Sequence, residues 1–186
     1  MSAARGGHGL TVASVVAGLA LVVGTLAGIA RADDRGGASA NGAFGAISCS
    51  APSRPGAVVD ARLSDLGASM MSRTPMRADL VVAPNTVRAG TVSFVAANTG
   101  ALVHELVVLP LPADGPGTTP TGSDGKIDES ASRAESSRSC AAGSGDGIAP
   151  GSTAWTATTL TPGRYEVVCD MPWHYTAGMF DVLTVT

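Results

Sequence analysis

The sequence RYEVVCDMPWHYTAGMFDVLTVT, residues 164–186, predicts two β-strands joined by a short loop. Both ends of this stretch are rich in valine and alternate apolar with polar side chains, which is the pattern of half-buried strands. The loop between them carries Cys169, His174 and Met179, with four residues between each and the next. Because the chain has only three cysteines, three histidines and six methionines, their gathering in one loop indicates a binding site.

Five further segments upstream show the same strand pattern and are separated by turns rich in glycine and proline. These segments are residues 57–66, 76–83, 89–98, 104–111 and 152–160. Seven short strands without a strongly amphipathic helix predict an all-β domain with the architecture of a Greek-key β-sandwich. The residues expected to face its core include Val59, Ala61, Leu63, Met76, Ala78, Leu80, Val82, Val92, Phe94 and Ala96.

Composition and charge exclude a nucleic-acid partner. The 186 residues are 45% apolar and 15% charged, which suffices for one compact domain with appendages. The formal net charge is −3, and Lys126 is the single lysine. Without a basic cluster the chain cannot meet the phosphates of DNA or RNA. We expect the domain to be a monomer.

Residues 1–32 have the features of an export signal. Within them, residues 10–30 form an uncharged apolar run after a basic N-terminus, and residues 30–32, Ala-Arg-Ala, fit a signal-peptidase site. The run is also long enough to span a bilayer, so an uncleaved membrane tether is the alternative, although we favour cleavage. Either way the folded part would be extracytoplasmic, whether secreted, periplasmic or anchored facing outward. Residues 33–55 are predicted to be a flexible leader and residues 56–186 the folded domain.

An oxidising compartment determines how the three cysteines are interpreted. At most two of them can pair, and Cys49 and Cys140 both lie in polar, turn-rich sequence typical of loops. Cys169 instead ends a strand and begins the loop that carries the histidine and the methionine. We therefore predict a Cys49–Cys140 disulfide and a free Cys169.

Residues 110–151 are predicted to be a long loop inserted into the domain. This stretch is rich in Gly, Ser, Pro and Asp, and at most a helical turn or two is expected near residues 128–137. We expect a solvated acidic excursion that is tethered by Cys140 and has no chemistry of its own, because its acids do not match the spacing of a calcium-binding EF-hand loop. Those acids are Asp114, Asp124, Asp128, Glu129 and Asp146.

The residue types in the C-terminal loop point to copper. One thiolate, two imidazoles and a distant thioether form a blue-copper site, in which sulfur suits Cu(I) and imidazole suits both oxidation states. The loop supplies three of these ligands, and His104 is the one further histidine beyond residues 1–32. The candidate ligands of one type 1 copper ion are therefore His104, Cys169, His174 and Met179.

Other chemistries fit these residues less well. A zinc site would need a harder fourth ligand than the thioether of Met179. If His104 and His174 are both ligands, no histidine beyond residues 1–32 remains for a hydrolytic catalytic pair, so we expect no enzyme.

Two segments resemble the cupredoxins, the small blue-copper β-sandwich proteins. They are NTGALVHELVVL, residues 98–109, and PGRYEVVCDMPWHYTAGMFDVLTV, residues 162–185. The Cys-x4-His-x4-Met spacing is similar to that of the rusticyanin and sulfocyanin branch. The copper ligands that the resemblance implies are the imidazoles of His104 and His174, the thiolate of Cys169 and the weak axial thioether of Met179.

Two positions depart from the pattern of many cupredoxins. Glu105 follows the first histidine, where Asn or Ser is common, and Trp173 precedes the second, where a small residue is common. Both positions lie next to ligands rather than among them. They therefore bear on tuning and docking more than on copper binding.

The resemblance implies a one-electron carrier that turns over no substrate. His104 would be the buried ligand, and His174 the partly exposed one through which electrons pass. The loop around His174 is apolar, so we expect an exposed hydrophobic patch where a redox partner protein docks near Trp173 and His174. The expected members of this patch are Met171, Pro172, Trp173, Tyr175 and Ala177.

A copper-delivery protein, in which the metal is cargo, is the alternative function. Met70, Met71 and Met76 form a cluster of thioethers, which in such a protein could hold Cu(I). They lie beside Pro75 with no histidine among them, so we favour ordinary packing of Met70 and Met76 against the sandwich.

Overall fold

A computed structural model describes residue 49, residues 53–66 and residues 77–186. Several sequence-based predictions fall outside these residues: the signal peptide or anchor of residues 1–32, most of the leader of residues 33–55, and the methionines Met70, Met71 and Met76. In the described part of the chain, no helix has the length and apolarity needed to cross a membrane.

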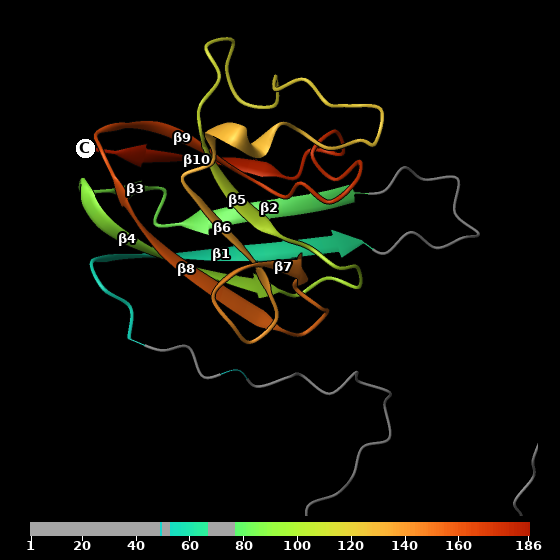
Figure 1. Cartoon of the computed structure of the whole chain (residues 1–186), viewed down its shortest axis with the longest axis horizontal. Helices are drawn as coiled ribbons and strands as arrows, with labels where there is room; N and C mark the ends of the chain where they lie inside the picture. The colour runs from blue at the N-terminus through green and yellow to red at the C-terminus, as the bar shows by residue number, and fades with distance from the viewer. Residues whose placement is uncertain (1–48, 50–52, 67–76) are drawn as a thin grey trace, which may run out of the picture. The chain divides into compact units, whose positions relative to one another are not determined.

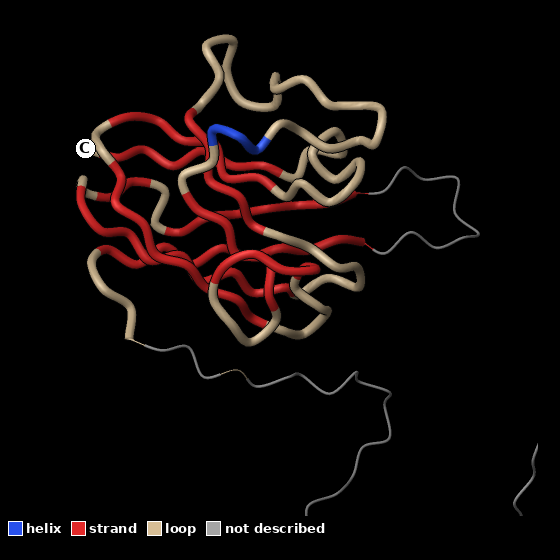
Figure 2. Tube along the Cα trace, in the orientation of Figure 1, coloured by secondary structure: helices blue, strands red, loops and turns tan. Residues whose placement is uncertain are grey.

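The described residues form ten strands and one short 3-10 helix, η1 (Figures 1 and 2). The elements are β1 Ala57–Leu66, β2 Arg77–Ala83, β3 Thr86–Val87, β4 Gly90–Asn98, β5 Leu106–Pro110, η1 Glu129–Ala131, β6 Ala134–Arg138, β7 Gly143–Gly147, β8 Thr153–Leu160, β9 Gly163–Val168 and β10 Phe180–Val185. All seven predicted strands are confirmed, because each overlaps one of these elements.

The strands form two mixed sheets. One sheet has four strands in the order β2-β1-β4-β8, and the other has six in the order β3-β10-β9-β5-β6-β7. In the first sheet β1 runs parallel to β4, with Val59 opposite Phe94. In the second, β9 and β10 pair antiparallel, with Val168 opposite Phe180. The loop that carries Cys169, His174 and Met179 joins these two neighbouring strands, so its two ends are held at one end of the six-stranded sheet.

One hydrophobic core lies between the two sheets, as a β-sandwich requires. It joins β1 and β4 of the first sheet to β5, β9 and β10 of the second, and Leu63, Phe94 and Leu183 in it are fully buried. Burying such a side chain stabilises the fold by roughly 1.5–3 kcal/mol. The predicted core residues are buried in the described strands: Val59, Ala61, Leu63, Ala78, Leu80, Val82, Val92, Phe94 and Ala96.

The prediction of a long loop at residues 110–151 was wrong in part. The predicted helical turn is present as η1, but β6 and β7 extend the six-stranded sheet inside this stretch. β6 pairs with β5, with Leu106 opposite Ser136. Its serines and the glycines of β7 have low strand propensity, but backbone hydrogen bonds to a neighbouring strand edge do not depend on apolar side chains. Composition alone therefore did not predict β6 and β7, which form by pairing with other strands of the sheet.

The predicted cysteine pairing is confirmed. Cys49 and Cys140 form a disulfide across a sequence separation of 91 residues, and Cys169 is a free, buried thiol. Cys140 lies in the turn between β6 and β7, so the bridge joins the chain before β1 to the outer edge of the six-stranded sheet.

Candidate metal centre

The backbone of the C-terminal loop holds three of the predicted ligands close together. Cys169 directly follows β9, and its N–H donates to the carbonyl of Met179, which directly precedes β10, at 3.0 Å. The N–H of Met179 donates in turn to the carbonyl of His174 at 3.1 Å, and that of His174 to Met171 at 2.9 Å. These bonds close the loop into a compact turn beyond the ends of the two strands (Figure 1).

The fourth predicted ligand comes from the neighbouring strand. His104 lies two residues before β5 and forms an isolated bridge with Ile148, whose N–H donates to the His104 carbonyl at 2.6 Å. Since β5 pairs with β9, with Val107 opposite Val168, the start of β5 lies beside the end of β9. The sheet thereby brings together two ligands that are 65 residues apart in sequence.

Three donor atoms converge in the buried space between these elements. The Nδ1 atoms of His104 and His174 lie 3.1 Å apart, and the Sγ atom of Cys169 lies 3.7 Å from the first and 3.4 Å from the second. His104, Cys169 and Met179 are fully buried. His174 is 7% exposed, so the ligand that was predicted to be partly exposed is largely buried.

Without a metal, the side chains of His104, Cys169 and His174 are uncharged near neutral pH. Burial raises the pKa of the Cys169 thiol to about 12, although N–H groups of Glu105 and Met171 favour the thiolate. Burial, and next the proximity of His104, lowers the pKa of His174 to about 4. A neutral imidazole offers its lone pair to a metal, and a cation that binds here displaces the thiol proton.

Asp65 contacts a candidate ligand directly, and the motif analysis missed it. Its Oδ2 atom lies 2.9 Å from the Nε2 atom of His104, and both side chains are fully buried. Oδ2 also accepts the N–H groups of Ala101 and Leu102 at 2.8 and 3.1 Å. One signal was available in the sequence: Asp65 continues the inward alternation of Val59, Ala61 and Leu63, so an acid occupies a core-facing position.

A second group of ionisable side chains lies behind the thiol. Glu105, whose N–H donates to Cys169 Sγ at 3.4 Å, is only 4% exposed, and its carboxylate clusters with those of Glu129 and Asp170. Lys126 supplies the positive charge, with its Nζ 3.8 Å from Glu105 and 3.7 Å from Asp170. Burial raises the pKa of Glu105 to about 7. Part of the acidic excursion is therefore ion-paired beside the site rather than solvated.

The segment between β5 and η1 contacts the ligand loop directly. The N–H of Trp173 donates to the Gly125 carbonyl at 3.0 Å. Tyr175 donates its hydroxyl to Glu166 at 3.1 Å and accepts the N–H of Thr119 at 3.0 Å. Tyr175 is therefore 3% exposed, and its predicted place in an exposed patch was wrong. In Figure 1 this segment, in yellow, lies next to the red ligand loop.

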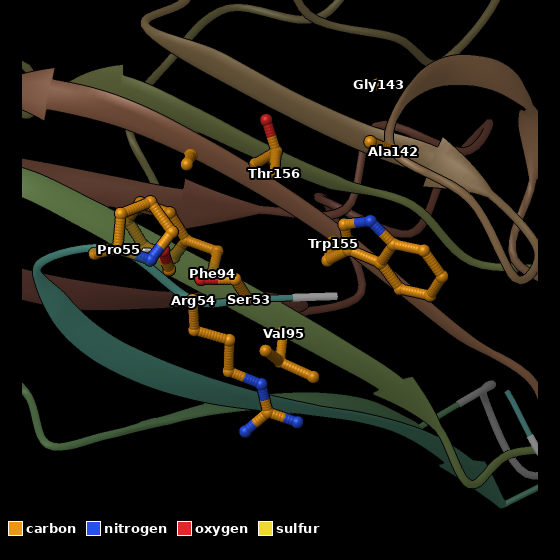
Figure 3. A pocket seen from close by; sticks show the side chains of 11 residues that line it. Ser53, Arg54, Pro55, Phe94, Val95, Ala142, Gly143, Trp155 and Thr156 are labelled. Carbon is orange, nitrogen blue, oxygen red and sulfur yellow. Dashed lines mark hydrogen bonds between the residues drawn. The ribbon is translucent and has the colours of Figure 1, made fainter. Parts of the chain in front are cut away.

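A hollow of about 500 Å³ lies away from these ligands, on the first sheet (Figure 3). Residues of β4 and β8, including Val95 and Trp155, line it together with Arg54 and Ala142. Arg54 is the one ionisable group among its described lining residues. A ligand site with chemistry needs convergent polar or titratable groups, so we place the functional site at the buried Cys-His-His cluster instead.

The fold and the site together define a type 1 copper protein of the cupredoxin class, with one copper ion as its cofactor. Residues 81–186, more than half of the chain, match the family model described as the sulfocyanin (SoxE) domain. The chain therefore belongs to the sulfocyanin family, and its resemblance to the rusticyanin and sulfocyanin branch is confirmed. Proteins of this class are electron carriers.

Similar solved structures include two auracyanins and a rusticyanin. Reduced auracyanin from Roseiflexus castenholzii is 21% identical over 70% of this chain and 96% of that chain, with a TM-score of 0.43. Rusticyanin from Thiobacillus ferrooxidans is 19% identical over 70% and 79%, with a TM-score of 0.43. Auracyanin A from Chloroflexus aurantiacus is 18% identical over 69% and 99%, with a TM-score of 0.42. No curated protein matches the chain.

Proposed function

We propose that this protein is an extracytoplasmic one-electron carrier whose single type 1 copper is held by His104, Cys169, His174 and Met179. The observation that carries the proposal is the convergence of one thiol sulfur and two imidazole nitrogens within 3.1–3.7 Å in a buried space. Carboxylates, which would favour harder ions, are absent from this group of three donors.

The donor set fits copper in both of its oxidation states. When bound, copper supplies a one-electron couple between Cu(II) and Cu(I). The thiolate of Cys169 and the imidazoles of His104 and His174 suit both forms, and the thioether of Met179 would favour Cu(I) as a weak axial ligand. Two strands and a hydrogen-bonded turn hold these residues, so their positions need to change little during electron transfer.

Export is supported by the disulfide. Structural disulfides persist in oxidising compartments and are rare in the cytosol of most organisms. The Cys49–Cys140 bridge therefore fits a protein that works outside the cytoplasm, as does the signal-like sequence of residues 1–32.

Electrons would enter and leave through the edge of His174. Trp173, which precedes His174, is 56% exposed, and Val103, which precedes His104, is 40% exposed. A methyl group added at Gly147 would meet both Val103 and Met171, so these two side chains border the same glycine. We define the docking patch as Val103, Met171, Pro172 and Trp173. Small apolar contacts allow fast docking and release, as electron transfer requires.

The visible spectrum of the Cu(II)-loaded protein tests this function. An intense band near the middle of the visible range reports a thiolate–copper bond. We expect the band in the wild-type protein and in Cys49→Ser, and its complete loss in Cys169→Ser. Reversible voltammetry would support a carrier, whereas colourless Cu(I) that chelators remove easily would support copper delivery instead.

A further inference from the structure

Among the residues that the structure describes, no lysine or arginine forms an ion pair with the buried carboxylate of Asp65. Within residues 53–66 and 77–186, the side-chain partner of Asp65 is the neutral His104 ring, and the Oδ1 atom of Asp65 makes no hydrogen bond. A buried carboxylate is costly unless a positive charge compensates it. Here a metal cation would supply the compensating charge. It would bind on the far side of the His104 ring, where Nδ1 faces Cys169 and His174.

We propose that Asp65 is a positioning residue that fixes the ring of His104 as a metal ligand and lowers the reduction potential of the copper. This inference rests on the proposed function, because it takes copper to bind at Nδ1 of His104. Asp65 accepts from Nε2 and so keeps the proton there, which leaves the lone pair of Nδ1 free for the metal.

The sign of the effect follows from charge. Cu(II) carries one more positive charge than Cu(I), so a buried negative charge on the opposite side of a ligand ring stabilises Cu(II) more. The hydrogen bond also makes the imidazole a stronger donor, which acts in the same direction. Met179 favours Cu(I), and Asp65 opposes it. In this chain the potential would therefore be set by two residues on opposite sides of the site.

The geometry permits a substitution that removes the charge alone. The three hydrogen bonds from His104, Ala101 and Leu102 all end on Oδ2 of Asp65. In Asp65→Asn the amide oxygen can occupy this position and accept all three. Asp65→Ala removes the charge and the contact together. Asp79→Asn is the matched control, because Asp79 is an exposed acid on β2 opposite Ser64, the neighbour of Asp65.

The midpoint potential of each copper-loaded variant provides the first test. We expect Asp65→Asn to keep the visible band and to favour Cu(I) at least tenfold more than the wild type, a rise of about 59 mV for a one-electron couple. Asp79→Asn should leave the potential unchanged. An Asp65→Asn protein with the wild-type potential would overturn the tuning role.

A metal-free measurement tests the positioning role separately. The ¹⁵N chemical shifts of the His104 ring report which nitrogen carries the proton. We expect the proton on Nε2 in the wild type and in Asp65→Asn, and a mixture of tautomers in a folded Asp65→Ala protein. An unchanged tautomer in Asp65→Ala would contradict the inference. If instead the wild-type protein bound copper without the visible band, the proposed function would fail while the tautomer result still stood.

Discussion

At the scale of single residues, the copper site is asymmetric in charge. Asp65 lies behind His104, whereas Glu105, Glu129 and Asp170 gather on the side of Cys169 with Lys126 as their cation. Three carboxyl groups near one ammonium cannot all be ionised without repulsion. The pKa values of Glu105 and Glu129 are both raised to about 7, so these two carboxyl groups make the stability of the fold depend on pH.

Glu129 provides a test of that dependence. Burial, and next its hydrogen bond with Asp170, raises the pKa of Glu129 from 4.5 to about 7. Between pH 4.5 and about pH 7, Glu129 holds a proton in the folded chain and releases it in the unfolded chain. The stability that this group contributes therefore falls as the pH rises across this range and is lost above the folded pKa of about 7. Relative to the wild type, Glu129→Gln should gain about 1–3 kcal/mol of unfolding free energy between about pH 4 and about pH 8.

Urea unfolding of the metal-free proteins at both pH values measures this gain. Asp128→Asn is the control, because Asp128 is exposed and its hydrogen bonds with Ser130 lower its pKa. Its effect on the unfolding free energy should not change across the same window. A pH-independent difference between Glu129→Gln and the wild type would show that Glu129 does not hold the proton.

At the scale of elements, the segment between β5 and η1 serves as a support for the ligand loop. Gly117 donates its N–H to Glu166 at 2.6 Å, and the same carboxylate accepts the hydroxyl of Tyr175 from the loop. Gly125 accepts the N–H of Trp173. The loop residues in these two contacts, Trp173 and Tyr175, flank His174 in the sequence. The position of the ligand loop therefore depends on a segment that contributes no copper ligand.

Substitution of Gly125 tests this support. A methyl group at Gly125 would lie 2.6 Å from the Trp173 ring and 2.9 Å from its backbone nitrogen. Gly125→Ala should displace the start of the ligand loop and shift both the visible band and the potential. It should also destabilise the fold by about 1–2 kcal/mol, because Gly125 has a positive φ of 76°.

Gly143→Ala is a matched control. Gly143 has a φ of 77°, but a methyl group there meets no atom within 4 Å. The control should therefore have the same backbone cost, about 1–2 kcal/mol, and an unchanged spectrum. Equal spectra in the two variants would mean that the segment does not position the loop.

At the scale of the whole molecule, the disulfide constrains most of the unfolded chain. Cys49→Ser removes a link across 91 residues and should lower the unfolding free energy of the metal-free protein by about 4–5 kcal/mol in the chain-entropy model. Denaturant unfolding measures the loss. Cys140→Ser and the double variant should match it, because each removes the same bridge. Losses that add in the double variant would contradict this explanation.

The docking patch makes a prediction about electron exchange between molecules. Trp173→Lys places a charge on an exposed member of the patch, and two such patches would repel one another. The rate of electron self-exchange should fall roughly tenfold, with little change in copper content or spectrum.

Val81→Lys is the control for this effect. Val81 is an exposed valine, 39% accessible, on β2, outside the docking patch. Val81→Lys should leave the rate of electron self-exchange near that of the wild type. If Trp173→Lys and Val81→Lys had the same effect, electrons would leave by another face of the molecule.

Local sequence determined the class of fold and most of the site. Strand periodicity is a property of neighbouring residues, so Val59, Ala61 and Leu63 could be assigned to a core before any contact was known. Cys169 and His174 lie in one loop and had to be close in space. His104 followed because no other histidine was available beyond residues 1–32.

Only the tertiary structure decided the surroundings of the ligands. Asp65 meets His104 because β1 runs parallel to β4, a pairing between distant segments that no local pattern encodes. Tyr175 is buried because Glu166 and Thr119 approach it from other elements. β6 and β7 are strands because a sheet edge was available to pair with them. Residue types and spacing identify ligands, whereas the groups that orient and tune those ligands depend on long-range packing.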